Sequence, residues 1–316
     1  MLVAGRKWWH GPPPSHRTRE AAGSGGERNG GPGVLRETMV YGASFHRAWS
    51  VRTHVLDTVD YAVSRLSGST LTIEDVHRCD DKSDVHVAIW SSASTSASTS
   101  ASASWGLDFP FSLPEAVYRD FALRDWPALV DFAERWEKTE FEQALEDCEL
   151  FDPRGKCRRP GDGCRITDAE SGAFSPLRRY LPNRLEAAHS GLRLLGYLKR
   201  FKAAVVYPFE GPDRKRARLY ETNPEGTMDR LGLGKPRNPW DFIEAFNDLP
   251  GRAVEIAPLP DHLRGREYEM ATVVSCATLA NAIRAFDLDE SWDHRPAFAT
   301  VPEWEMRQKE GLIVRL

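Results

Sequence analysis

The sequence predicts an α/β fold with a mixed β-sheet flanked by helices. Three observations support this class. Short apolar runs separated by turn residues open the ordered part of the chain, apolar residues recur at helical spacing through the middle, and two later strand-like runs each end in an acid. Hairpin-linked strands pair antiparallel, whereas strands separated by helices pair parallel, so the sheet should be mixed. At 316 residues, the chain is long enough for one large core or two small ones.

Residues 1–38 and 39–316 differ in composition. The first segment is rich in Gly, Pro and Arg and has no apolar periodicity, so it is expected to be a disordered extension. No apolar core follows its Arg6–Lys7 pair, and we expect no secretory signal there. The ordered domain should therefore occupy 39–316. No apolar run reaches the roughly 18 to 20 residues that a membrane helix needs, so no membrane partner is expected.

The first half of the domain should contribute strands. Met39–Phe45 is predicted to be a short buried strand. Loose alternation over 53–66 and in 69–77, with Gly68 as a turn residue between them, predicts antiparallel strands joined by a hairpin. The Ser/Ala/Thr tract at 91–104 buries too little apolar surface to offset its ordering entropy, and is expected to be a flexible loop.

Helical signals dominate 115–200, which we interpret as a largely helical insertion. Asp125 followed by Trp126 and Pro127 predicts a helix N-cap. The segment 150–183 is polar and loop-like, and 184–201 has the apolar spacing of an amphipathic helix.

The last third returns to strands and helices. Strands are predicted at 203–209 and Ala217–Thr222, and helices at 239–246 and 267–286. The final helix is apolar and rich in small residues, so it should pack closely on the sheet. The apolar end of the chain, GLIVRL, predicts an edge strand.

The sequence WGLDFPFSLP, at 105–114, is the first candidate for a functional site. It delivers one acid, Asp108, to the end of an apolar run that stops at prolines. Glu221 ends a second strand in the same way, before Asn223 and Pro224. The alternative for Asp108 is a buried strand whose acid caps the following turn.

These stretches resemble the RNase H-like superfamily, and specifically the family of predicted nucleases named domain of unknown function 429. WGLDFPFSLP is similar to the family pattern GIDAPFGLP, and LYETNPEGTMDRLGL is similar to EVYPAATLRALG. VYGASF and the helix EMATVVSCATLANAI match the remaining two family motifs less well. The resemblance covers about 39–286 and implies an RNase H-like sheet.

The resemblance implies a metal-dependent phosphodiester hydrolase. Such enzymes use two divalent cations, about 3.5–4 Å apart, held by three or four carboxylates from different elements. Asp108 and Glu221 match the family's middle-strand and third-motif acids, so they are the expected catalytic residues and ligands of Mg²⁺ or Mn²⁺. Pro110 and Pro114 match the turn after the middle strand.

Two family acids have no counterpart in this chain. Where the family has GVDFSGA, this sequence places Ser44 at the acid position, and a neutral hydroxyl is a poor magnesium ligand. The acid of the last helix is also missing. Glu269 is the expected substitute metal ligand, with Asp57 and Asp60 as further candidates. The alternative function is a non-catalytic RNase H-like protein that binds nucleic acid or a protein partner.

Charge and cysteine content limit the partners and the compartment. The net charge of −4 gives no global basic field for nucleic acid, although the basic turn at 214–218 is a candidate phosphate contact. The five cysteines are widely spread without a CxxC pair. Cys148, Cys157 and Cys164 are read as free thiols in a reducing cytoplasm, with a three-thiolate metal site as the alternative.

Overall fold

The structure, a computed structural model, describes residues 37–45, 59–79, 82–99, 102–146, 156–161, 163–179, 183–213, 215–234, 238–263, 270–286, 288 and 300–316. The strands are β1 (Thr38–Ser44), β2 (Val59–Ser67), β3 (Thr70–Cys79), β4 (Ser102–Leu107), β5 (Ala204–Val206), β6 (Ala217–Thr222), β7 (Glu255–Ile256) and β8 (Ile313–Val314). The helices are α1 (Lys82–Thr99), α2 (Glu115–Asp120), α3 (Trp126–Arg135), α4 (Lys138–Glu146), α5 (Ile166–Ser171), α6 (Arg184–Arg200), α7 (Pro224–Arg230), α8 (Pro239–Asn247), α9 (Met270–Phe286) and α10 (Val301–Glu310), with a 3₁₀ turn at Asp261–Leu263.

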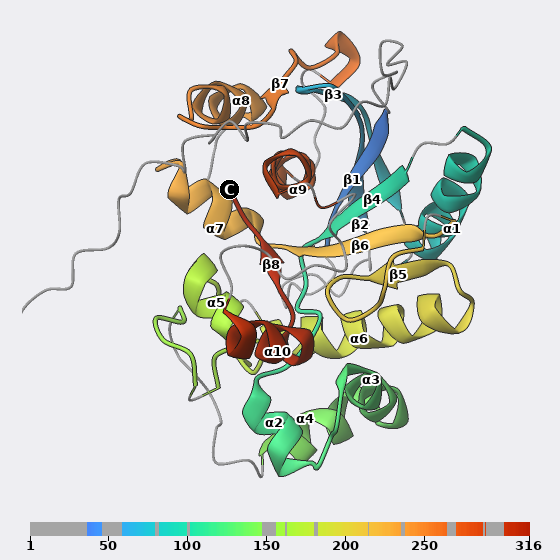
Figure 1. Cartoon of the computed structure of the whole chain (residues 1–316), viewed down its shortest axis with the longest axis vertical. Helices are drawn as coiled ribbons and strands as arrows, with labels where there is room; N and C mark the ends of the chain where they lie inside the picture. Colours follow the sequence, from blue (N-terminus) through green and yellow to red (C-terminus); the bar gives the residue numbers. More distant parts are fainter. Residues whose placement is uncertain are drawn as a thin grey trace, which may run out of the picture. The chain divides into compact units, whose positions relative to one another are not determined.

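The described strands form a single mixed sheet, which confirms the α/β class (Figure 1). Their order is β5-β6-β4-β1-β2-β3-β7, and β8 pairs with β6 beyond the end of β5. β1, β2 and β3 are an antiparallel meander, whereas β4 is parallel to β1 and β6 is parallel to β4. The C-terminal ends of β1, β4 and β6 therefore lie along one edge of the sheet, where the candidate acids were predicted.

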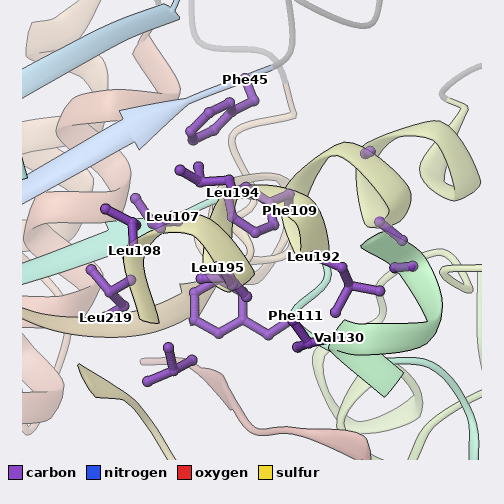
Figure 2. Close-up of a cluster of buried hydrophobic side chains, with 14 of the residues drawn as sticks. Phe45, Leu107, Phe109, Phe111, Val130, Leu192, Leu194, Leu195, Leu198 and Leu219 are labelled. Atoms are coloured by element: carbon purple, nitrogen blue, oxygen red, sulfur yellow. The ribbon is translucent and has the colours of Figure 1, made fainter. Parts of the chain in front are cut away.

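Helices cover both faces of the sheet and create two hydrophobic cores. One core joins Leu107 and Leu219 of the sheet to α3 and α6 (Figure 2). The other core lies between the opposite face and the helices α8 and α9. Nearly every residue of α9 is buried, which explains why its sequence is apolar on all sides.

α9 packs against the sheet at two glycines. A Cβ atom on Gly42 would lie 2.1 Å from the backbone oxygen of Thr272, and one on Gly106 would lie 3.3 Å from the backbone oxygen of Ser275. A side chain at Gly42 would collide with helix backbone, so β1 needs glycine there. The predicted close packing of the last helix on the sheet is confirmed.

The prediction of a flexible loop at 91–104 is wrong. Residues 91–99 continue α1, and β4 begins at Ser102. Alanine has the highest helix propensity, and the serine hydroxyls find partners on the helix itself. Ser91 Oγ donates to the carbonyl of Val87 (2.7 Å), and Ser92 Oγ donates to the carbonyl of Ile89 (2.7 Å) while accepting from Trp105 Nε1 (2.9 Å). These bonds order a segment that composition alone describes as flexible.

Two further predictions need correction. The segment 150–183, expected to be a loop, contains α5, and β1 begins at Thr38, the last residue of the expected extension. The remainder of the expected extension at 1–36 lies outside the described residues. Most other predicted elements are confirmed, including the N-cap, where Asp125 Oδ1 accepts from the backbone N of Ala128 (3.0 Å). None of the helices in the described residues is both long and apolar enough to cross a membrane.

Candidate functional site

Asp108 ties together the ends of two neighbouring strands. It follows β4 directly and is 2% exposed. Its Oδ1 accepts from the backbone N of Phe45 (2.8 Å), and its Oδ2 accepts from Ser44 Oγ (3.1 Å). The predicted first-strand position, Ser44, therefore does meet Asp108, but it meets it as a neutral hydrogen-bond donor. Both carboxylate oxygens consequently have partners from the end of β1.

Glu221 lies near the end of β6, beside the end of β4. It is in register with Leu107, and side chains in register on parallel strands share a face. Asp108 lies one residue beyond the end of β4, next to the end of β1. The partners described for the two acids differ, because Glu221 Oε2 accepts from the backbone N of Phe111 (3.0 Å) whereas Asp108 binds the end of β1. Both acids lie at the same edge of the sheet, and the partners described for each are different.

A buried arginine, Arg165, binds the carboxylate of Glu221. Arg165 donates from Nη2 to Glu221 Oε1 (2.6 Å) and from Nη1 to Oε2 (2.9 Å). The same guanidinium donates to Asp168, from Nε to Oδ2 (2.9 Å) and from Nη2 to Oδ1 (2.6 Å). The three side chains are 0–1% exposed. We call Arg165, Asp168 and Glu221 the arginine cluster; each carboxylate in it binds the guanidinium with both oxygens, a strong pairing geometry.

Within the arginine cluster, burial and neighbouring charges have opposite effects on the pKa values of Glu221 and Arg165. Burial raises the pKa of Glu221 above its ordinary value, and the adjacent Arg165 works against that rise. Burial alone would lower the pKa of Arg165, but Asp168 and Glu221 outweigh it and hold the pKa well above the ordinary arginine value. The guanidinium is thus a permanent countercharge, and Glu221 is a structural partner of that charge.

The C-terminal segment closes over the arginine cluster. Glu310, at the end of α10, accepts from the backbone N of Glu115 with Oε1 (2.7 Å) and from that of Ile166 with Oε2 (2.9 Å). These N–H groups start α2 and α5, so one carboxylate caps two helices. The backbone oxygen of Glu310 accepts from Arg165 Nη1 (3.2 Å), and a Cβ atom on Gly311 would lie 3.4 Å from Glu221 Oε2. Glu221 is covered by the chain on this side.

A disulfide precedes Arg165. Cys157 and Cys164 are bonded, with their Cα atoms 5.9 Å apart, so the prediction of free thiols is wrong for this pair, and so is the alternative of a three-thiolate metal site that would include them. Gly161 and Gly163 have φ values of +90° and +84°, which permit the tight loop between the cysteines. Disulfides persist in oxidising compartments, so this bond does not favour the predicted reducing cytoplasm. Cys148 lies outside the described residues.

Of the other candidate metal ligands, only Asp60 lies within the described residues. Asp60 lies opposite Ser44 on β2, but its carboxylate is bound by Arg78, from Nε to Oδ1 (2.8 Å) and from Nη2 to Oδ2 (3.0 Å). Asp57 and Glu269 lie outside the described residues. Within the part of the chain that the structure describes, no group of three His, Cys, Asp or Glu side chains is arranged to hold a metal ion. These residues do not fit a Mg²⁺ or Mn²⁺ centre, which needs several carboxylates converging on the ion.

Several cations of the basic turn and of α6 are buried or have partners within the protein. In the basic turn, Arg216 pairs with Asp213 (3.0 Å) and Arg218 is 3% exposed, while residue 214 lies outside the described residues. On α6, Arg200 pairs with Glu134 (2.8 Å). Arg193, also on α6, pairs with Glu137 (3.4 Å), and Lys199 lies over the ring of Trp126 (5.4 Å). These contacts neutralise or occupy the positive charge that a nucleic acid would need.

The sequence did not indicate which residues bind and cover the carboxylate of Glu221. Arg165 and Asp168 form an RxxD pair at the start of α5, a pattern that indicates a local helix cap. Nothing in the sequence indicates that Arg165 also binds an acid 56 positions away. Glu310 lies further still, and its role as a double cap depends on tertiary structure. No family model, curated protein or solved structure matches the chain.

Proposed function

We propose that this chain is a non-catalytic RNase H-like protein that binds a protein partner. The single observation that carries the proposal is the arginine cluster, in which Arg165 takes both oxygens of Glu221. Hydrolysis by two metals needs carboxylates that converge on cations about 3.5–4 Å apart. Glu221 instead neutralises a buried guanidinium, and Asp108 joins β1 to β4.

The strand arrangement supports the RNase H-like part of the proposal. An antiparallel meander, β1-β2-β3, is followed by strands parallel to β1 that are separated by helices. This is a mixed sheet of the kind that the resemblance implies, and Asp108 ends its central parallel strand, β4. In this proposal the acids of an ancestral site have acquired structural roles.

An exposed aromatic surface supports a protein partner over a nucleic acid. It consists of His86, Val87 and Trp90 of α1, Tyr197 of α6 and Phe201 at its end; Trp90 and Phe201 are 63% and 59% exposed. His86 and Tyr197 stack at 4.7 Å, and Tyr197 and Phe201 lie 4.6 Å apart, so the two helices present adjoining rings. Exposed apolar patches mark protein interaction sites, and the nearby cations of α6 are paired with acids.

Two assays test the absence of catalysis and of nucleic-acid binding. With Mg²⁺ or Mn²⁺, wild type should cleave single- and double-stranded DNA and RNA no faster than the Asp108→Asn variant. Fluorescent 20-nucleotide DNA and RNA strands should show no saturable change in anisotropy at about 0.15 M salt, because the net charge of −4 provides no global basic field. Cleavage by wild type that is lost in Asp108→Asn would show that the protein is a nuclease. Tight binding of an oligonucleotide would show that its partner is a nucleic acid.

A matched set of variants tests the aromatic surface. A Trp90→Ala, Phe201→Ala double variant removes two rings from it, and Trp240→Ala removes a partly exposed ring from α8 as the control. Proteins cross-linked to wild type in its native extract should be retained by Trp240→Ala and lost from the double variant. Equal cross-linking by all three proteins would contradict the assignment of the partner to this surface.

A further inference from the structure

A cavity beside the C-terminal strand combines an apolar wall with positive charge. Its volume is about 290 Å³, near the lower limit of the roughly 300–1,000 Å³ that small-molecule sites occupy. Apolar side chains from the end of α9 and from the C-terminal segment line it, among them Phe286 and Leu312. Polar side chains reach it from the other elements around it: Glu170, Tyr207, Arg230, Arg307 and Arg315.

Guanidinium groups outnumber carboxylates among the described residues that line this cavity. Arg307 and Arg315 both pair with Glu170, and no other acidic side chain is among those lining residues. Glu170 Oε1 accepts from Arg307 Nη2 (2.6 Å), and its Oε2 lies 3.6 Å from Arg315 Nη2. Arg230 donates from Nη1 to the backbone oxygen of Leu316 (2.5 Å). If Leu316 carried a carboxylate, the three guanidiniums would face two anions, that carboxylate and Glu170. The lining would still have a net positive charge.

The pKa of Arg315 responds to its burial and to the other two guanidiniums. Burial lowers its pKa below the ordinary arginine value, Glu170 opposes the change, and the charges of Arg230 and Arg307 lower the pKa further. An anion bound among these groups would relieve their repulsion. A guanidinium binds a carboxylate or a phosphate through two parallel N–H groups, so arginine is well suited to such a ligand.

A second hollow adjoins the charged side of the cavity. This hollow has a volume of about 440 Å³ and shares Glu170, Arg230 and Arg315 with the cavity. Arg230 itself is exposed. A ligand can therefore place an anionic head at the shared guanidiniums and an apolar tail against the Phe286 and Leu312 side.

We propose that this cavity binds a small amphipathic anion, with its carboxylate or phosphate head at Arg230 and Arg315 and its apolar tail against Phe286 and Leu312. The site is distinct from Asp108, from the arginine cluster and from the aromatic surface. It stands whether or not the proposed non-catalytic role is correct.

Calorimetric titration with sodium octanoate, below the concentration at which it forms micelles, tests the proposal. Wild type should bind octanoate at one saturable site, and should bind neutral 1-octanol and the tailless anion acetate at least about tenfold more weakly, because each lacks one half of the interaction. Octyl phosphate serves as a second probe, and whichever probe binds more tightly identifies the preferred head. No saturable binding of either amphiphile, or equal binding of octanoate and octanol, would overturn the proposal.

Two arginine variants separate this site from general surface attraction. Arg230→Gln should weaken octanoate binding about tenfold or more, since a hydrogen bond to a charged group is lost. Arg193→Gln removes a half-exposed arginine of α6, remote from the cavity lining, and should bind as wild type does. Arg230 is exposed, so its replacement should preserve the fold, which circular dichroism verifies. Equal binding by the two variants would place the ligand elsewhere and refute the assignment.

Discussion

Replacing Arg165 by methionine should lower the free energy of unfolding by about 3–5 kcal/mol at pH 7, because removing one partner of a buried ion pair leaves uncompensated charge. Arg165, Asp168 and Glu221 are all essentially inaccessible to solvent, so water cannot replace the lost guanidinium. Methionine keeps much of the side-chain length and isolates the effect of charge. Urea unfolding at equilibrium measures the loss.

An exposed arginine provides the control for this variant. Arg193 pairs with Glu137 at side-chain exposures of 42% and 78%, and such surface pairs contribute about 0–1 kcal/mol. Arg193→Met should therefore leave the free energy of unfolding nearly unchanged. If Arg165→Met cost no more than Arg193→Met, the arginine cluster would not be the structural element described here.

The effect of Arg165→Met should also depend on pH. Without the guanidinium, burial raises the pKa of Glu221 further above its unfolded value of about 4.3. A carboxyl group whose folded pKa is raised stabilises the fold below the unfolded pKa, and this contribution is lost as pH rises through the folded pKa. The difference in the free energy of unfolding between Arg165→Met and wild type should be largest at pH 7 and should become smaller towards pH 5. A difference independent of pH would argue against an ionised Glu221.

Replacing Gly42 by alanine should destabilise the protein by about 3 kcal/mol or more, at or above the usual 1–3 kcal/mol for overpacking. The new methyl carbon would lie 2.1 Å from the backbone oxygen of Thr272 and 2.7 Å from the backbone N of Cys276. Backbone atoms inside a helix cannot rotate away, so α9 would have to separate from β1. Gly211 is exposed, and Gly211→Ala should change the free energy of unfolding by less than about 0.5 kcal/mol. Equal thermal midpoints for the two variants would contradict the close packing of α9.

Local signals explain which parts of the fold were predictable. β6 begins and ends at the predicted residues, Ala217 and Thr222, and Asp125 caps α3 because an Asp followed closely by proline is a short-range pattern. The Ser/Ala tract at 91–104 was misjudged because its composition suits both a loop and a helix. Contacts that are remote in sequence, such as the bond between Ser92 and Trp105, help to order its start.

The candidate site was only partly predictable for the same reason. A strand that ends in an acid indicates where Asp108 and Glu221 lie, and both do lie at the predicted edge of the sheet. Their partners come from residues far away in sequence. The Arg165 guanidinium and the Ser44 hydroxyl decide what the two carboxylates do, and spacing along the chain contains no record of those contacts.

The central claim is that the acids at this edge have structural partners and do not form a metal centre. Titration with Mn²⁺, followed by the electron paramagnetic resonance signal of the free ion, tests it most directly. The account predicts no saturable site in wild type, and the same titration curve for Asp108→Asn. One or two saturable sites in wild type that disappear in Asp108→Asn would contradict it, and would show that Asp108 is a metal ligand.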